Sequence, residues 1–291
     1  GSLLYKSIVL VAGLALAALT AAADDYFWNN AGGGDWSVAA NWKLGSTGTG
    51  GDALGAPGEN DTAYFCMGTY TITLSENVRV YKVFVKNQDR NQPCFVTVDL
   101  KGFTMETLAE SGTDGYVAYG DVSHPKAGLT FVNGQVYSTG GAAVAFKPEW
   151  AWTGNLVLDN VTVSLTNGLA VQGAYPRLVV TNGTKLAIGG NLGGRVYRRT
   201  DAVDIVGPNV ELDVAGAINF FGPQNVRMRG GAWIRQNQGH FYVAGYEQDY
   251  GGEPAGQRAP RVWLDNVTVT NTGLRTELRL GIDNMGCALT L

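Results

Sequence analysis

The residues of this chain that could do chemistry gather first in a charged segment of its second half. They are Arg195, Arg198, Arg199, Asp201 and Asp204. The planar fork of an arginine side chain matches a carboxylate, so paired arginines would hold the acidic groups of a polysaccharide. With neighbouring carboxylates holding Ca²⁺, such a site would suit β-elimination by a polysaccharide lyase. The plainer interpretation, which we favour, is a solvated loop whose local ion pairs contribute little.

A second group surrounds a long polar loop near the end of the chain. The loop runs from Glu247 to Arg261, is rich in Gly and Pro, and follows His240 and Tyr242 closely. Long loops on a rigid scaffold often carry binding function, and His240 would titrate near neutral pH as an acid or base. A single histidine in a strand is more often an ordinary surface residue. We therefore keep His240 only under the enzymatic alternative.

Aromatic side chains offer a third kind of chemistry, the stacking of sugar rings. Trp263 stands between apolar Val262 and Leu264, so in an alternating strand its side chain faces outward. We take Trp233, Tyr242 and Trp263 as candidate ligand-binding residues for an extracellular glycan. The alternative is that these rings pack beneath loops.

Glycoside hydrolysis would need two carboxylates that face each other across a cleft. Four aspartates at similar repeat positions are formal candidates: Asp159, Asp204, Asp213 and Asp265. Asp159 and Asp265 precede bend asparagines, where a short acceptor simply suits a turn. The sequence also has no Gly-x-Ser-x-Gly motif, phosphate-binding loop or histidine-rich metal motif. We therefore expect no catalysis, no metal and no cofactor, with Ca²⁺ entering only under the lyase alternative.

The elements that must position these residues are short strands in a repeat. The hexapeptide Leu-Asp-Asn-Val-Thr-Val occurs at 158–163 and again at 264–269. Looser copies place a turn residue between two runs of alternating apolar residues, the pattern of a half-buried strand. The turn residues are Asn133, Asn160, Asn182, Pro208, Gly230 and Asn266. They are separated by 27, 22, 26, 22 and 36 residues, and the last interval becomes 22 without the 14 loop residues from Glu247 to Pro260.

A fixed period with extra residues confined to loops is typical of a solenoid. A period of about 22 residues suits one coil of three short strands. We therefore predict an all-β fold, a single-stranded right-handed parallel β-helix. Asparagines at equivalent bends would stack into a ladder from coil to coil. An antiparallel β-sandwich is the alternative, because Asn-Gly at 133–134 and 182–183 would also close hairpins.

The beginning of the chain predicts export. In residues 1–23, Lys6 precedes an apolar run that is too short to span a bilayer and that ends in small residues, as in a signal peptide. We expect no membrane span in the mature chain. The formal net charge of −4 argues against a nucleic-acid partner, which would require clustered Lys and Arg.

Residues 24–68 differ from the repeats and contain three tryptophans, Trp28, Trp36 and Trp42. We interpret this segment as a cap that covers the open end of the first coil, because exposed strand edges and apolar interiors must be covered. A sugar-binding platform is the alternative. Residues 69–291 form the β-helix, and we expect a missing C-terminal region to continue it.

The three cysteines, Cys66, Cys94 and Cys287, form no CxxC or Cys/His metal pattern. In an oxidising compartment Cys66 and Cys94 would be able to pair and staple the N-terminal region. The sequence leaves open whether this disulfide forms.

The segment from Trp28 to Phe65 contains a Trp-Asn-Asn opening and then Pro57-Gly58-Glu59-Asn60-Asp61-Thr62-Ala63-Tyr64-Phe65. It resembles the start of exported bacterial β-helix proteins that carry autotransporter-associated β-strand repeats. The resemblance implies a secreted or cell-surface passenger with a structural, adhesive or glycan-binding role, whose partners are an extracellular glycan or a host or cell surface. It implies no catalytic residue. A polysaccharide lyase or glycoside hydrolase with a groove along the β-helix remains the alternative.

Overall fold

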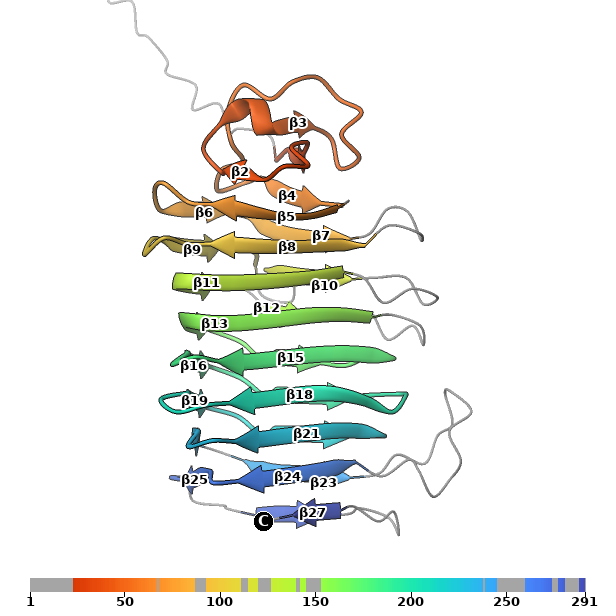
Figure 1. Ribbon diagram of the computed structural model, residues 1–291, viewed down its shortest axis with the longest axis vertical. Helices are drawn as coiled ribbons and strands as arrows, with labels where there is room; N and C mark the ends of the chain where they lie inside the picture. The colour runs from red at the N-terminus through yellow and green to blue at the C-terminus, as the bar shows by residue number, and fades with distance from the viewer. Residues whose placement is uncertain are drawn as a thin grey trace, which may run out of the picture.

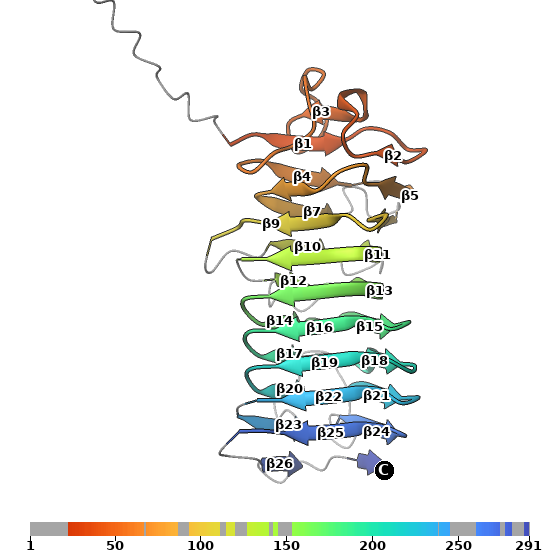
Figure 2. The same ribbon diagram turned by 90° about the vertical axis from the view of Figure 1, so that its left-hand side faces the viewer.

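The chain forms a column of β-strands stacked along one axis, with an irregular N-terminal segment at one end (Figures 1 and 2). The computed structural model describes residues 23–66, 68–86, 93–110, 115–119, 127–139, 142–144, 153–237, 239–244, 260–273, 277–280 and 288–290. The predicted signal peptide, except for its last residue, lies outside the described residues. So do positions 247–259 of the long loop, and position 287.

Successive strands of each coil enter three faces in turn. The first face is a parallel ladder that contains β5 (Gly68–Thr73), β8 (Cys94–Asp99), β15 (Tyr175–Thr181), β18 (Thr200–Val206), β21 (Gln224–Arg229), β24 (Arg261–Asp265) and β27 (Ala288–Thr290). Two long strands, β11 (Ala127–Ser138) and β13 (Thr153–Leu165), belong to this ladder with their first halves.

The second halves of β11 and β13 lie on the second face, because each of these strands continues around the corner. Its other strands are β6 (Val78–Val80), β9 (Thr104–Thr107), β16 (Lys185–Ile188), β19 (Glu211–Val214), β22 (Trp233–Gln236) and β25 (Thr268–Asn271). The third face is a six-stranded parallel sheet of β12 (Ala142–Val144), β14 (Leu169–Val171), β17 (Leu192–Arg195), β20 (Ile218–Phe221), β23 (His240–Ala244) and β26 (Glu277–Leu280).

All of these ladders are parallel, which confirms the predicted parallel β-helix and excludes the β-sandwich alternative. The repeated hexapeptide occupies the same place in two coils. Leu158 and Leu264 lie in one row of the first face, joined through β15, β18 and β21. Residues 158–163 and 264–269 each run across the corner to the second face. Equal sequence therefore marks equal position, as expected of a solenoid.

The corners between the first and second faces require a left-handed backbone. Asn133, Asn160, Asn182 and Asn266 have φ between 50° and 59°, and Gly230 has φ 76°. Asparagine and glycine tolerate this region better than other residues. At the turn of Pro208 the positive φ values fall on its two neighbours, Gly207 and Asn209, because the proline ring holds φ negative.

The interior is filled by rows of apolar side chains that stack from coil to coil. Val203, Val226 and Val262 form one such row and are almost completely buried. Parallel strands lie about 4.8 Å apart, so each row brings side chains into direct contact. Two buried hydroxyls, those of Thr107 and Ser138, satisfy each other through a hydrogen bond of 2.9 Å.

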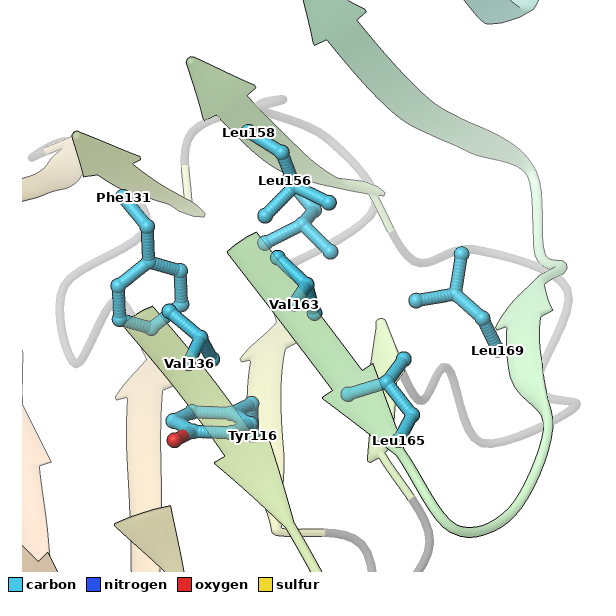
Figure 3. Close-up of a pocket in the computed structure, with 8 residues that line it drawn as sticks. All are labelled: Tyr116, Phe131, Val136, Leu156, Leu158, Val163, Leu165 and Leu169. Atoms are coloured by element: carbon cyan, nitrogen blue, oxygen red, sulfur yellow. The ribbon is translucent and has the colours of Figure 1, made fainter. Parts of the chain in front are cut away.

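A small cavity lies between core side chains of the column (Figure 3). It measures about 10 Å³, which leaves room for at most one water molecule, and its lining is apolar. Among the side chains labelled in Figure 3, Tyr116 alone has an oxygen atom. Its hydroxyl lies 2.9 Å from the carbonyl oxygens of Met105 and Tyr137. This space is therefore a gap between core side chains that is about the size of one water molecule.

The N-terminal segment closes the first coils. β1 (Asp25–Trp28) pairs with β4 (Thr62–Phe65) in parallel and with β3 (Trp42–Leu44) in antiparallel orientation. The same five-stranded sheet continues through β7 (Lys82–Lys86) and β10 (Tyr116–Tyr119). A short 3₁₀ helix, Ala39–Asn41, precedes β3, and β2 (Gly34–Asp35) pairs with β5.

The three tryptophans of this segment are at most 3% exposed. Trp42 lies 5.0 Å from Trp28 and 4.8 Å from Trp36 between ring centroids, in edge-to-face contacts. Such pairs stabilise a core beyond the burial of their area. The rings therefore cover the end of the column, and their burial rules out the sugar-platform alternative for Trp28, Trp36 and Trp42.

The two described cysteines, Cys66 and Cys94, are both buried and both free, so they are not joined by a disulfide. The Cys94 thiol donates to the Phe65 carbonyl oxygen over 3.2 Å. Burial raises the pKa of Cys66 to about 12, and burial also raises the pKa of Cys94. Both side chains therefore behave as small buried hydrophobic groups and not as reactive thiolates.

Candidate functional site

The outer surface of the first face carries a charged cluster from three consecutive coils. Asp204 of β18, Arg227 of β21 and Trp263 of β24 occupy one row, because their Cα atoms are partners in the ladder. Asp201 lies beside this row, and its Oδ1 is 3.1 Å from Arg227 Nη1. The Arg227 guanidinium carbon in turn lies 5.1 Å from the centroid of the Trp263 ring.

Two further side chains complete the cluster. Asn225 donates from Nδ2 to Asp201 Oδ1 over 2.8 Å, and Arg229 Nη2 lies 3.5 Å from Asp204 Oδ2. We call Asp201, Asp204, Asn225, Arg227, Arg229 and Trp263 the first-face cluster. Each of these contacts joins one coil to the next, so the cluster is built from the repeat and not from one loop.

A β-bulge explains how Asp201 and Asp204 reach the same surface. Their spacing of three residues would place them on opposite sides of a regular strand. The pairing of β18 with β21 shifts register between Asp201 and Val203, and Ala202 and Val203 are both buried. A bulge of this kind re-aims the side chains that precede it. Asp201 is thereby directed outward, beside Asp204.

The electrostatics of the cluster favour an ionised, paired carboxylate at Asp201. Partial burial raises the pKa of Asp201, but the hydrogen bonds from Asn225 and Arg227 and the charges of Arg227 and Arg177 outweigh it and hold the pKa below its ordinary value of 3.8. A general acid needs the opposite, a pKa raised toward neutral pH. Asp201 therefore holds no proton to donate at pH 7. Its carboxylate contacts Asn225 and Arg227 of the neighbouring coil.

The second face carries a similar but smaller group. Lys185 Nζ lies 3.3 Å from Glu211 Oε1, and Arg235 Nη1 lies 3.5 Å from Asp213 Oδ2. The guanidinium carbon of Arg235 also lies 4.8 Å from the centroid of the Trp233 ring. We call Lys185, Glu211, Asp213, Trp233 and Arg235 the second-face patch. Like the first-face cluster, it joins neighbouring coils through opposite charges.

The predicted arginines do not share the surface of the two aspartates. Arg195 ends β17 on the third face, whereas Arg198 and Arg199 are half-buried in the connection from β17 to β18. Asp201 and Asp204 take Arg227 and Arg229 of the next coil as ion-pair partners. Arg227 and Arg229 lie one repeat after the aspartates. An alignment of the coils would therefore have identified them as candidate partners.

His240 lies apart from this charged segment. It begins β23 on the third face, and its ring centroid is 4.8 Å from that of Tyr242. In this sheet the row that contains Arg195 passes through Phe221 to Ala244, four residues beyond His240. At about 3.3 Å per residue, this separates His240 from that row by roughly 13 Å. The structure does not bring His240 to Arg195.

The three candidate sugar-stacking residues lie on three different faces. Trp263 is on the first face, Trp233 on the second and Tyr242 on the third. Trp263 is half-buried over Arg227, and Trp233 is 40% exposed. Trp263, Trp233 and Tyr242 therefore do not form a single aromatic stripe, and any sugar contact would be made by one of them alone.

In the part of the chain that the structure describes, no group of three or more His, Cys, Asp or Glu side chains is arranged to hold a metal ion. Over that same part, no helix is long and apolar enough to cross a membrane. Comparison with protein-family models, with curated proteins and with solved structures found no match to this chain. The fold and the surface chemistry are therefore the basis for a functional proposal.

Proposed function

We propose that this chain is an exported β-helix scaffold with a structural or adhesive role at the cell surface, and that it is not an enzyme. The observation that carries the proposal is the use of outward-facing acidic side chains to connect neighbouring coils. The connections recur along the column, in Glu106–Arg79, Asp99–Asn133, Asp159–Asn182, Glu211–Lys185, Asp201–Arg227 and Asp213–Arg235.

The pattern suits a scaffold because it adds contacts between neighbouring coils to those of the backbone ladder and of the apolar interior. One exposed ion pair contributes little, with typical values of about 0.2–1 kcal/mol. A column that repeats such contacts in successive coils gains from their sum, and a solenoid is stabilised mainly by contacts between neighbouring repeats. The lowered pKa of Asp201 also disfavours it as the general acid of a glycosidase, which needs a raised pKa.

The exported location is supported by the sequence. Residues 1–23 have the charged start, the apolar run and the small residues of a signal peptide. The Trp28–Phe65 segment resembles the start of passengers with autotransporter-associated repeats, which reside outside the cell. Only 16% of the residues are charged, and charged side chains on the outside of the column form ion pairs between coils. Such a surface agrees with a passenger that presents a long, stable face.

Cell fractionation tests the location. The full chain is expressed in a Gram-negative bacterium beside a variant that lacks residues 2–23, and both are followed with a C-terminal tag. We expect the full chain outside the cytoplasm, shortened at its N-terminus by about the length of the signal, and the variant inside. Recovery of the full chain in the cytoplasm with residues 1–23 intact would contradict export.

A further inference from the structure

Trp233 is the most exposed tryptophan among the described residues. It is 40% exposed on β22, whereas Trp28, Trp36 and Trp42 are at most 3% exposed. Burying an aromatic side chain of this size would stabilise the fold by about 1.5–3 kcal/mol, which Trp233 forgoes in part. An exposed ring on a well-ordered strand is a common feature of ligand-binding surfaces, since it offers large contact area at low conformational cost.

The ring is held on a rigid part of the column. β22 lies between β19 and β25 and pairs with both, so its backbone is fixed on two sides. The Arg235 guanidinium carbon lies 4.8 Å from the ring centroid of Trp233, and Nη1 of the same guanidinium lies 3.5 Å from Asp213 Oδ2. Asn237 also donates to Asp213 Oδ1. These contacts order the ring before any ligand arrives, which reduces the entropic cost of binding.

The polar groups around the ring suit hydroxyl groups. Glu211 is the ladder partner of Trp233, so its backbone lies about 4.8 Å away in the preceding coil. Its exposed carboxylate accepts hydrogen bonds, and the guanidinium of Arg235, whose carbon lies 4.8 Å from the centroid of the Trp233 ring, supplies donors. Arg235 is the ladder partner of Asp213, and Asp213 is the partner of Ala187 in the coil before it. The small side chain of Ala187 does not project over the neighbouring surface.

The same groups disfavour an acidic ligand. The cations of the second-face patch, Lys185 and Arg235, are already paired with Glu211 and Asp213. A uronate would have to displace one of these carboxylates or approach it against like charge. A neutral sugar needs no such exchange, because its ring stacks through C–H groups and its hydroxyls donate to carboxylates.

We propose that the second-face patch is a binding site for a neutral hexose or pentose unit of an extracellular polysaccharide. The sugar ring stacks on Trp233, one hydroxyl donates to Glu211, and Arg235 donates to a sugar oxygen. This inference rests on the proposed extracellular role for its biological setting, but the site itself is defined by Trp233, Glu211 and Arg235.

Affinity electrophoresis of the purified full chain tests the site. Native gels contain dextran, mannan, xylan or polygalacturonate, and the retardation of each protein gives its relative affinity. We expect retardation by at least one of the three neutral polysaccharides and less by polygalacturonate. Trp233→Ala should weaken it at least tenfold and Glu211→Ala about threefold, since the first removes the stacking ring and the second removes the hydrogen-bond acceptor. The matched control is Tyr175→Ala, which removes a ring of 37% exposure from another face and should bind like the wild type.

Three results would overturn the assignment. They are no retardation of the wild type in any gel, retardation by polygalacturonate alone, and equal retardation of the wild type and Trp233→Ala. A circular dichroism spectrum for each variant confirms that the strands are retained. None of these results bears on export or on the absence of turnover, so a failure of this site leaves the scaffold proposal to its own tests.

Discussion

Asn160 donates a hydrogen bond from Nδ2 to Oδ1 of Asn133 over 3.0 Å, although the two residues are 27 positions apart in the chain. Both have a left-handed backbone, with φ values of 53° and 59°. The Nδ2 atom of Asn133 lies 3.3 Å from Asp99 Oδ1, which extends the contact to a third coil. One residue type thus turns the chain at the corner and connects the coils, which explains why asparagine recurs there.

Replacing Asn160 separates these two roles. Asn160→Ala loses the hydrogen bond and pays for a left-handed backbone, together about 1.5–3.5 kcal/mol of unfolding free energy. Asn160→Gly keeps the backbone conformation at little steric cost and should be destabilised by about 1 kcal/mol less than the alanine variant. Urea denaturation of the three proteins measures the difference. Equal losses for glycine and alanine would show that the backbone conformation has no energetic role.

The pairing of Asp201 predicts a loss of stability in acid. Because the pKa of Asp201 is lowered in the folded state, the unfolded chain takes up its proton first as the pH falls through about 3.8. The contribution of Asp201 is therefore complete near neutral pH and is lost as the pH falls below that value. Asp201→Asn should have a smaller drop in unfolding free energy between pH 6 and pH 3, by less than about 1 kcal/mol since the group is half exposed. Identical pH profiles for Asp201→Asn and the wild type would contradict this pairing.

The interior rows make large-to-small changes costly. Leu158 is 1% exposed and lines the small internal cavity. Leu158→Ala should reduce the unfolding free energy by about 2–5 kcal/mol, because it removes buried apolar groups and enlarges an apolar cavity. The control is Val157→Ala, its outward-facing neighbour, for which we expect a loss below about 1 kcal/mol. Thermal and urea unfolding measure both variants, and a similar small loss for both would contradict the assignment of Leu158 to the core.

The buried cysteines predict thiols that react slowly. Burial raises the pKa of Cys66 to about 12 and raises that of Cys94, so almost no thiolate is present at neutral pH. In a Cys287→Ser variant, we expect no reaction with a disulfide reagent in the native state and two reactive thiols after unfolding without reductant. Rapid labelling of the native protein would contradict the burial. Finding no thiol after unfolding would show instead that Cys66 and Cys94 had become a disulfide.

Sequence reasoning predicted the parallel β-helix because its signals are local and repeated. The hexapeptide that includes Leu158 and its copy that includes Leu264 mark equivalent positions, and the bend asparagines mark the corners. The spacing of those marks is the coil length, so the fold class followed without any long-range information.

The surface sites were less predictable because they depend on register and on bulges. Strict alternation places Asp201 and Asp204 on opposite sides, and only the bulge before Val203 brings them together. Trp233 and Trp263 follow the same alternating pattern, yet the corner at Gly230 places Trp233 on another face. Pairs such as Asp201–Arg227 arise between coils, and their partners can be identified only after the coils have been aligned.

The central claim is that the outward charges serve cohesion and not catalysis, and an assay for turnover tests it most directly. The folded full chain is incubated with dextran, mannan, xylan and polygalacturonate, and new reducing ends and unsaturated ends are measured against protein-free controls. We predict no increase over those controls for any polysaccharide. Turnover of one of them that disappears in Asp201→Asn or Asp204→Asn would contradict the account and assign the first-face cluster to an enzyme.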